Sequence, residues 1–196
     1  MRIMGIDPSV SSTGISLPGK ITLAVRPRSE GDLRLSEIGN AVSFYAREYT
    51  IELAVIEDLA GTYPGKSARI IPMLHGVIRD RLQLAAVPFM LINPKTLKGF
   101  ATGNGNADKD EMMLAARRHL GRFYATDDEC DADWLRVAGR TAYGLGELTE
   151  YGDGKNEQWL RLPDEQVCLL RRTRSGEKIE WPRIGNRLPW PRVALR

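Results

Sequence analysis

The first part of the chain reads RIMGIDPSVSSTGISLPGKITLAV over residues 2–25. Its first apolar run ends in Asp7 followed by a Pro-Ser turn, which predicts a short buried strand with a carboxylate at its end. Two further apolar runs, residues 13–17 and 20–25, flank a Pro-Gly pair and predict a β-hairpin. We therefore expect the chain to begin with a strand followed by a hairpin.

Helices and strands alternate beyond the hairpin. Apolar residues at steps of three and four predict amphipathic helices over about residues 32–49 and 67–85. Apolar runs predict strands at residues 51–56 and 87–92, and the first of these is followed by Glu57. This alternation favours an α/β fold, with parallel pairing wherever a helix links two strands.

Two more helices are expected after a connection rich in lysine and glycine at residues 95–106. Asp108 with Glu111, and Thr126 with Glu129, have the spacing of capping boxes, so each pair predicts the start of a helix.

Length and composition are typical of one mid-sized domain with an appendage. The chain has 196 residues, of which 42% are hydrophobic, enough to close a core. It has no long apolar run, no signal peptide before the first strand, and no metal-spaced pair between Cys130 and Cys168. We therefore expect a cytoplasmic protein without a membrane span.

The C-terminal segment is the basic part of the chain. Residues 154–196 carry ten Lys and Arg against five Asp and Glu, and contain three Trp-x-Arg elements. We predict a domain at residues 1–150 and a basic Trp/Arg-rich extension at residues 151–196, folded as a small β appendage. Its tryptophans either cover its own apolar face or, with the arginines, bind phosphates and stack on bases.

Acidic residues follow two of the predicted strands. If the strands ending at Asp7 and Glu57 are parallel neighbours, both carboxylates project from the edge of the sheet where α/β proteins bind ligands. Like charges aimed at the protein body are costly unless a proton or cation neutralises them. Hard divalent cations such as Mg²⁺ and Mn²⁺ prefer such oxygen ligands.

The last predicted helix carries further acids. Asp128 and Asp131 lie one helical turn apart, and Asp131 shares the stripe of Leu135, which is expected to face inward. Asp133 lies about 200° from Asp131 on a helical wheel, so we expect it to face solvent. The wheel does not separate Asp127 from Asp128 as the second inward acid.

Four segments together resemble the RuvC-type Holliday junction resolvases, particularly their phage-encoded relatives. They are GIDPSVSSTG at 5–14, AVIED at 54–58, NPKTLKGFATGNGNADKDEM at 93–112 and DECDADWLRVA at 128–138. The resemblance covers roughly residues 1–148. It implies a ribonuclease H-like mixed sheet flanked by helices, a homodimer, and metal-dependent cleavage of four-way DNA junctions by paired symmetric nicks.

The resemblance also implies roles for individual residues. Four acids match the family's ligands for Mg²⁺, with two ions expected per site and Mn²⁺ able to substitute: Asp7, Glu57, Asp128 and Asp131. Lys98 and Lys109 match basic residues that lie near the scissile phosphate in the family. Ala60 stands where the family has an aromatic residue that helps to open the junction, and Tyr63 is a loose substitute. Five residues are further candidates for DNA contact: Tyr63, Lys66, Lys95, Arg161 and Arg183.

Three other functions compete with junction cleavage. A flap or general branched-DNA endonuclease would use the same acids. Actin-like ATPases share the opening motif but need a second such half, for which 196 residues leave little room. A non-catalytic nucleic-acid scaffold would not explain why all four acid positions are filled.

Overall fold

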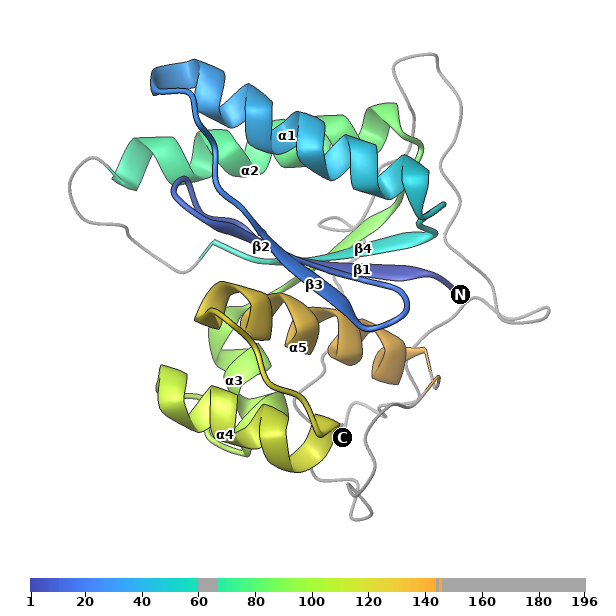
Figure 1. Ribbon diagram of the computed structural model, residues 1–196, viewed down its shortest axis with the longest axis vertical. Helices are drawn as coiled ribbons and strands as arrows, with labels where there is room; N and C mark the ends of the chain where they lie inside the picture. The colour runs from blue at the N-terminus through green and yellow to red at the C-terminus, as the bar shows by residue number, and fades with distance from the viewer. Residues whose placement is uncertain (60–66, 144, 146–196) are drawn as a thin grey trace.

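The computed structural model describes residues 1–59, 67–143 and 145. In this part of the chain one mixed sheet lies between two helical layers, as expected for a ribonuclease H-like fold (Figure 1). No helix in the same ranges is both long and apolar enough to cross a membrane. Tyr63, Lys66, Cys168 and the predicted extension at 151–196 lie outside the described residues.

The sheet has five strands in the order β3-β2-β1-β4-β5. They are β1 (Ile3–Asp7), β2 (Thr13–Leu17), β3 (Ile21–Val25), β4 (Leu53–Glu57) and β5 (Phe89–Ile92). β1, β2 and β3 pair antiparallel, which confirms the predicted hairpin. β4 pairs parallel with both β1 and β5, as the alternation of strands and helices predicts.

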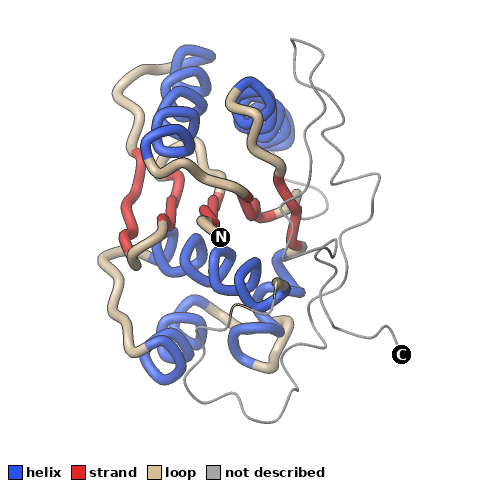
Figure 2. Tube along the Cα trace, turned by 90° about the vertical axis from the view of Figure 1, so that its right-hand side faces the viewer, coloured by secondary structure: helices blue, strands red, loops and turns tan. Residues whose placement is uncertain are grey.

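The helices form a single layer on one face of the sheet and two stacked layers on the other (Figure 2). The helices α1 (Gly31–Glu48) and α2 (Ser67–Leu84) cover one face of the sheet, and α5 (Asp127–Ala142) covers the other. The helices α3 (Pro94–Thr102) and α4 (Lys109–Leu120) pack on the far side of α5. Alternate strand residues therefore enter two separate cores, with Ile3 on the α5 side and Met4 on the side of α1 and α2.

The connection predicted at residues 95–106 was wrong in its first half, because α3 occupies it. Asn93 caps this helix by accepting a hydrogen bond from the Lys95 backbone N–H at 2.9 Å, and Pro94 fits the first turn because its missing N–H would be unpaired there. Gly103 ends the helix with a φ of 79°. The apolar face is short, and its buried members are Leu97, Phe100 and Ala101.

Both predicted cap positions begin helices, but in different ways. Asp108 and Glu111 form the complete capping box of α4. Thr126 accepts a hydrogen bond from the Glu129 backbone N–H at 3.3 Å, whereas the Glu129 side chain accepts one from the Thr22 hydroxyl at 3.2 Å. The start of α5 is therefore joined to the edge strand β3.

Two glycines let α5 lie directly on the sheet. A Cβ atom at Gly14 would stand 2.6 Å from the carbonyl carbon of Asp128, and one at Gly5 would stand 2.7 Å from the backbone nitrogen of Arg136. Any larger residue would displace the helix, since these neighbours are main-chain atoms. Glycine in β1 and β2 thus sets the distance between α5 and the sheet.

The prediction that Asp133 faces solvent was wrong. Its side chain is fully buried, and its Oδ1 accepts hydrogen bonds from the Ser16 hydroxyl at 2.6 Å and from Arg136 Nε at 2.9 Å. Its Oδ2 accepts from the Tyr124 hydroxyl at 2.6 Å and from Arg122. The helical wheel assumes one buried face, whereas α5 has the sheet on one side and α3 and α4 on the other.

Candidate metal centre

The carboxyl ends of β1 and β4 place two acids side by side. The register of these parallel strands pairs Ile6 with Ile56, and the next residue along each strand is Asp7 or Glu57. The two carboxyl groups lie close enough for each to act on the pKa of the other. The arrangement expected from the two strand ends is therefore present at this edge of the sheet.

The first turns of α5 bring more negative charge to the same edge. Burial raises the pKa of Asp7 well above its usual range, and Glu57 and Asp131 raise it further. The carboxylates of Asp128 and Asp127 act on Asp7 in the same direction. Five acids from β1, β4 and α5 therefore interact electrostatically at one place.

Burial and mutual repulsion also act on the other two inward acids. The pKa of Glu57 is raised to about 7, first by burial and then by Asp131, whereas Lys98 opposes the shift. The pKa of Asp131 is raised to about 6, first by burial and then by Asp127. A protein environment that disfavours ionised carboxylates to this degree favours a compensating cation.

The donor set fits a hard divalent cation in kind. It consists of carboxylate oxygens only, which Mg²⁺ and Mn²⁺ prefer. Among the residues that the structure describes, no three His, Cys, Asp or Glu side chains lie close enough together to hold an ion as they stand. Binding of an ion would therefore draw these carboxylates closer together.

Two lysines border this acidic edge. Lys98 lies in α3 and lowers the pKa of both Glu57 and Asp131 by its positive charge. Lys109, the first residue of α4, forms an ion pair with Asp127 that raises the pKa of the lysine and lowers that of the acid. The Lys109 side chain is 78% exposed, so it is accessible to an anionic ligand.

The ion pair with Lys109 distinguishes Asp127 from Asp128, which the helical wheel could not do. The Asp127 carboxylate hydrogen bonds to Lys109 at the surface, and nothing in the sequence pattern indicated this partner. Lys95 is exposed in the first turn of α3, near the N-cap Asn93. Of the other DNA-contact candidates, Tyr63, Lys66, Arg161 and Arg183 fall outside the described ranges.

Sequence reasoning missed the residues that hold α5 in place. Glycines inside strand patterns signal close approach of another backbone, so Gly5 and Gly14 could have been recognised. No comparable signal marks Ser16 or Tyr124, because their partner Asp133 becomes visible only when α5 is placed between two layers.

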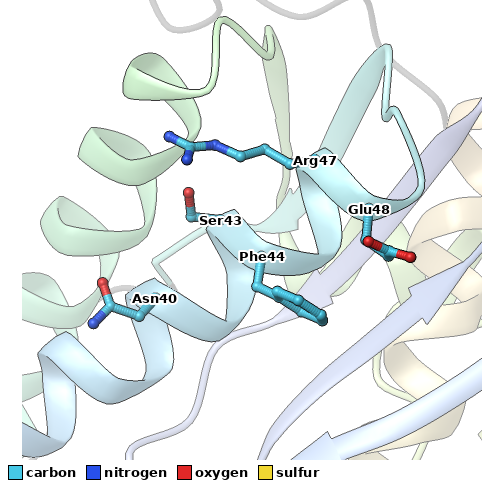
Figure 3. A pocket seen from close by; sticks show the side chains of 5 residues that line it. All are labelled: Asn40, Ser43, Phe44, Arg47 and Glu48. Carbon is cyan, nitrogen blue, oxygen red and sulfur yellow. The ribbon is translucent and has the colours of Figure 1, made fainter.

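A separate hollow of about 470 Å³ lies along α1 (Figure 3). All of its lining residues belong to that one helix: Asn40, Ser43, Phe44, Arg47 and Glu48. It lies on the face of the sheet opposite to α5 and contains none of the clustered carboxylates. The acidic edge is therefore the stronger candidate for a catalytic centre.

The sequence matches curated proteins over most of its length. A crossover junction endodeoxyribonuclease RuvC of Brachyspira hyodysenteriae is 30% identical over 148 residues, which span 70% of this chain and 92% of that protein. The protein of the same name from Corynebacterium diphtheriae is 33% identical over 150 residues, which span 69% of this chain and 90% of its own length. No protein-family model matches the chain.

Solved structures agree with the sequence matches in fold. The structure of Thermus thermophilus RuvC matches with a TM-score of 0.60 at 20% identity, over 76% of this chain and 99% of its own. RuvC of the same organism in complex with a Holliday junction substrate also gives 0.60, at 21% identity. With the mixed sheet and the acids at its edge, these relationships show that the chain belongs to the RuvC family of crossover junction endodeoxyribonucleases.

Proposed function

We propose that this protein cuts four-way DNA junctions by metal-dependent hydrolysis at the edge where β1 and β4 end. The observation that carries the proposal is the convergence of Asp7, Glu57 and Asp131, whose pKa values are raised by burial and by neighbouring carboxylates. Such a site attracts divalent cations and is otherwise costly to keep in a fold. The relatives named crossover junction endodeoxyribonuclease support the choice of substrate.

Four carboxylates are assigned to the ions. Asp7, Glu57, Asp128 and Asp131 would hold two Mg²⁺, for which Mn²⁺ can substitute. Bound divalent ions supply an activated water and stabilise the charge on the attacking and leaving oxygens of a phosphodiester. The carboxylates would hold the ions and would favour hard cations over soft ones, because they offer only oxygen ligands.

The two lysines are assigned to the phosphate. The exposed Lys109 would release Asp127 and neutralise a non-bridging phosphate oxygen, and Lys98 would act from α3 on the other side of the acids. Lys95 in the same helix, with Tyr63, Lys66, Arg161 and Arg183, would contact the DNA backbone away from the reacting phosphate.

The active form is proposed to be a two-fold symmetric dimer. A four-way junction contains paired equivalent strands, and one site can cut only one of them at a time. Isologous contact between two copies places two active sites on one DNA-facing side. The resemblance assigns this contact to the helix observed as α2, where Met73 is 48% exposed.

Cleavage of defined DNA substrates tests the function. The full-length protein is incubated with an end-labelled immobile four-way junction, a flap and a plain duplex, each with Mg²⁺, Mn²⁺ or EDTA. We expect symmetric nicks in two strands of like polarity in the junction, and no cleavage in EDTA. Equal cleavage of the flap would make the protein a general branched-DNA endonuclease, and cleavage in EDTA would exclude the metal assignment.

A further inference from the structure

A buried charged cluster lies inside the protein, beside the acidic edge and not part of it. Asp133 is 0% exposed and Arg136 is 1% exposed, between α5 and the sheet. Taking charges out of water destabilises a fold unless they are paired, and apolar residues of similar size usually pack at least as well. Packing alone therefore does not account for this cluster.

The cluster joins α5 to the sheet close to the proposed ligands. Asp133 follows Asp131 by two residues, and its Oδ1 accepts a hydrogen bond of 2.6 Å from the Ser16 hydroxyl in β2. Arg136 Nε donates to the same Ser16 oxygen at 3.0 Å and to Asp133 at 2.9 Å. The Ser16 side chain of β2 is thus held by Asp133 and Arg136, which lie three residues apart on the same face of α5.

The same carboxylate also holds the connection between α4 and α5. The hydroxyl of Tyr124 donates to Asp133 Oδ2 at 2.6 Å, and Arg122 forms an ion pair with it. This connection leads from α4, which begins with Lys109, to the first turn of α5. One buried side chain therefore links β2, α5 and the segment that follows α4.

These bonds oppose a repulsion that acts on the start of α5. Asp127, Asp128 and Asp131 of α5 interact electrostatically with Asp7 at the sheet edge, and these carboxylates repel one another whenever they are ionised together. The glycine contacts of β1 and β2 permit close approach but supply little attraction. A charge-assisted hydrogen bond two residues after Asp131 counteracts the repulsion where it acts.

We infer that Asp133 is a positioning residue that holds the start of α5 against β2 through Ser16 and Tyr124, so that Asp131 and Asp128 stay beside Asp7 in spite of their repulsion. The inference rests on the proposed metal site. It predicts that removing hydrogen bonds to Asp133 weakens the binding of divalent ions by more than the accompanying loss of fold stability explains.

Paired deletions of single hydroxyl groups test this. Ser16→Ala and Tyr124→Phe each remove one donor to Asp133 and leave both arginines in place. Ser16→Ala also removes one acceptor of Arg136 Nε. The matched control is Trp134→Phe, which removes the hydrogen bond of 3.3 Å from the buried indole to the Met112 carbonyl, on the side of α5 away from the sheet. For each full-length variant, thermal unfolding is followed in EDTA and in a titration with Mn²⁺.

We expect the Mn²⁺ titration to shift to higher concentration in the Ser16 and Tyr124 variants and not in the control Trp134→Phe. The Mn²⁺ concentration for half of the maximal rise in unfolding temperature should increase about tenfold in the Ser16→Ala/Tyr124→Phe double variant. It should stay within about twofold in Trp134→Phe, even where both proteins melt equally early in EDTA. If the double variant fails to fold, each single variant should show about a threefold increase.

Each contrary result has a distinct meaning. If wild-type protein shows no Mn²⁺-dependent rise in unfolding temperature, the proposed metal site itself is wrong. If wild type shows the rise and the Ser16 and Tyr124 variants shift the titration no more than Trp134→Phe, the metal site stands and the positioning role of Asp133 is overturned.

Discussion

Gly14 in β2 lies against the main chain of Asp128 at the start of α5, so closely that a Cβ atom there would stand 2.6 Å from the Asp128 carbonyl carbon. The neighbour is backbone and cannot rotate away. Any side chain at this position must displace the first turn of α5, which carries the acids of the candidate metal centre. Close packing and the geometry of the site therefore depend on the same glycine.

Replacing Gly14 by alanine should lower the unfolding free energy by about 1–3 kcal/mol, the usual cost of overpacking. Junction cleavage in Mg²⁺ should fall by more than tenfold, because the acids of α5 move away from Asp7. The control is Gly76→Ala in α2, where an added Cβ meets nothing within 4 Å and should raise helix stability by about 0.5–1 kcal/mol. Urea unfolding gives both values. An unchanged unfolding free energy in Gly14→Ala would contradict the close packing of Gly14 against the Asp128 backbone.

Replacing Asp7 by asparagine should stabilise the protein in EDTA by about 1 kcal/mol or more, since it removes one of several repelling carboxylates. It should also remove the rise in unfolding temperature with Mg²⁺ and abolish cleavage, while junction binding persists. Asp110→Asn, at an exposed position in the first turn of α4, should change none of these properties. More than about a tenth of wild-type activity in Asp7→Asn would exclude Asp7 from the metal ligands.

His75 in α2 should make the fold sensitive to acid. Burial, with the nearby charge of Arg79, lowers its pKa from 6.5 to about 4, although Asp58 opposes the shift. In the unfolded chain His75 is therefore protonated below about pH 6.5, whereas in the folded protein it is protonated only below about pH 4. The folded protein therefore loses stability as the pH falls from 6.5 to 4. The loss approaches about 3 kcal/mol at the lower end of this range.

Comparison with His75→Gln isolates this contribution, because groups common to both proteins cancel in the difference. Urea unfolding in EDTA from pH 4 to pH 8 should show the variant gaining about 3 kcal/mol relative to wild type at the acid end. Parallel stability curves for the two proteins would show that His75 does not titrate in this way.

The proposed dimer can be disrupted on α2. Met73→Glu places charges opposite each other across a two-fold contact, so the dimer dissociation constant should rise by more than about tenfold, equivalent to about 1.4 kcal/mol. Phe44→Glu on α1 replaces a side chain of similar exposure, 59%, and should leave the dimer intact. Light scattering measures both variants. Wild-type protein that is monomeric both alone and on a junction would refute the dimer.

Arg161 and Arg183, which lie outside the described residues, are predicted to contact phosphates. Changing both to glutamine should flatten the dependence of log binding constant on log salt by about 0.9 for each lost duplex contact. Cleavage at saturating junction should persist. Arg47→Gln, in the hollow on α1, serves as a control that removes one positive charge away from the candidate DNA contacts, and it should leave the slope unchanged. An unchanged slope in the double variant would leave the Trp-x-Arg pattern without a DNA-binding role.

Local patterns were sufficient to predict much of the fold. The runs that end at Asp7 and Glu57 are strands, the Pro-Gly pair joins a hairpin, and Asp108 with Glu111 caps a helix. These features depend on neighbouring residues and on the two-residue period of a strand, both of which are visible in a sequence. Parallel pairing then follows from connection rules, and it brings the two strand-end acids together.

Only the tertiary structure decided what surrounds α5. A helical wheel divides residues between two sides but cannot show that both sides are covered, so it misplaced Asp133. The partners of that residue come from β2 and from the segment after α4, and Lys109 comes to Asp127 from a different helix. These pairings depend on how layers stack at distances set by Gly5 and Gly14, and no periodicity along the chain encodes contacts between segments so far apart.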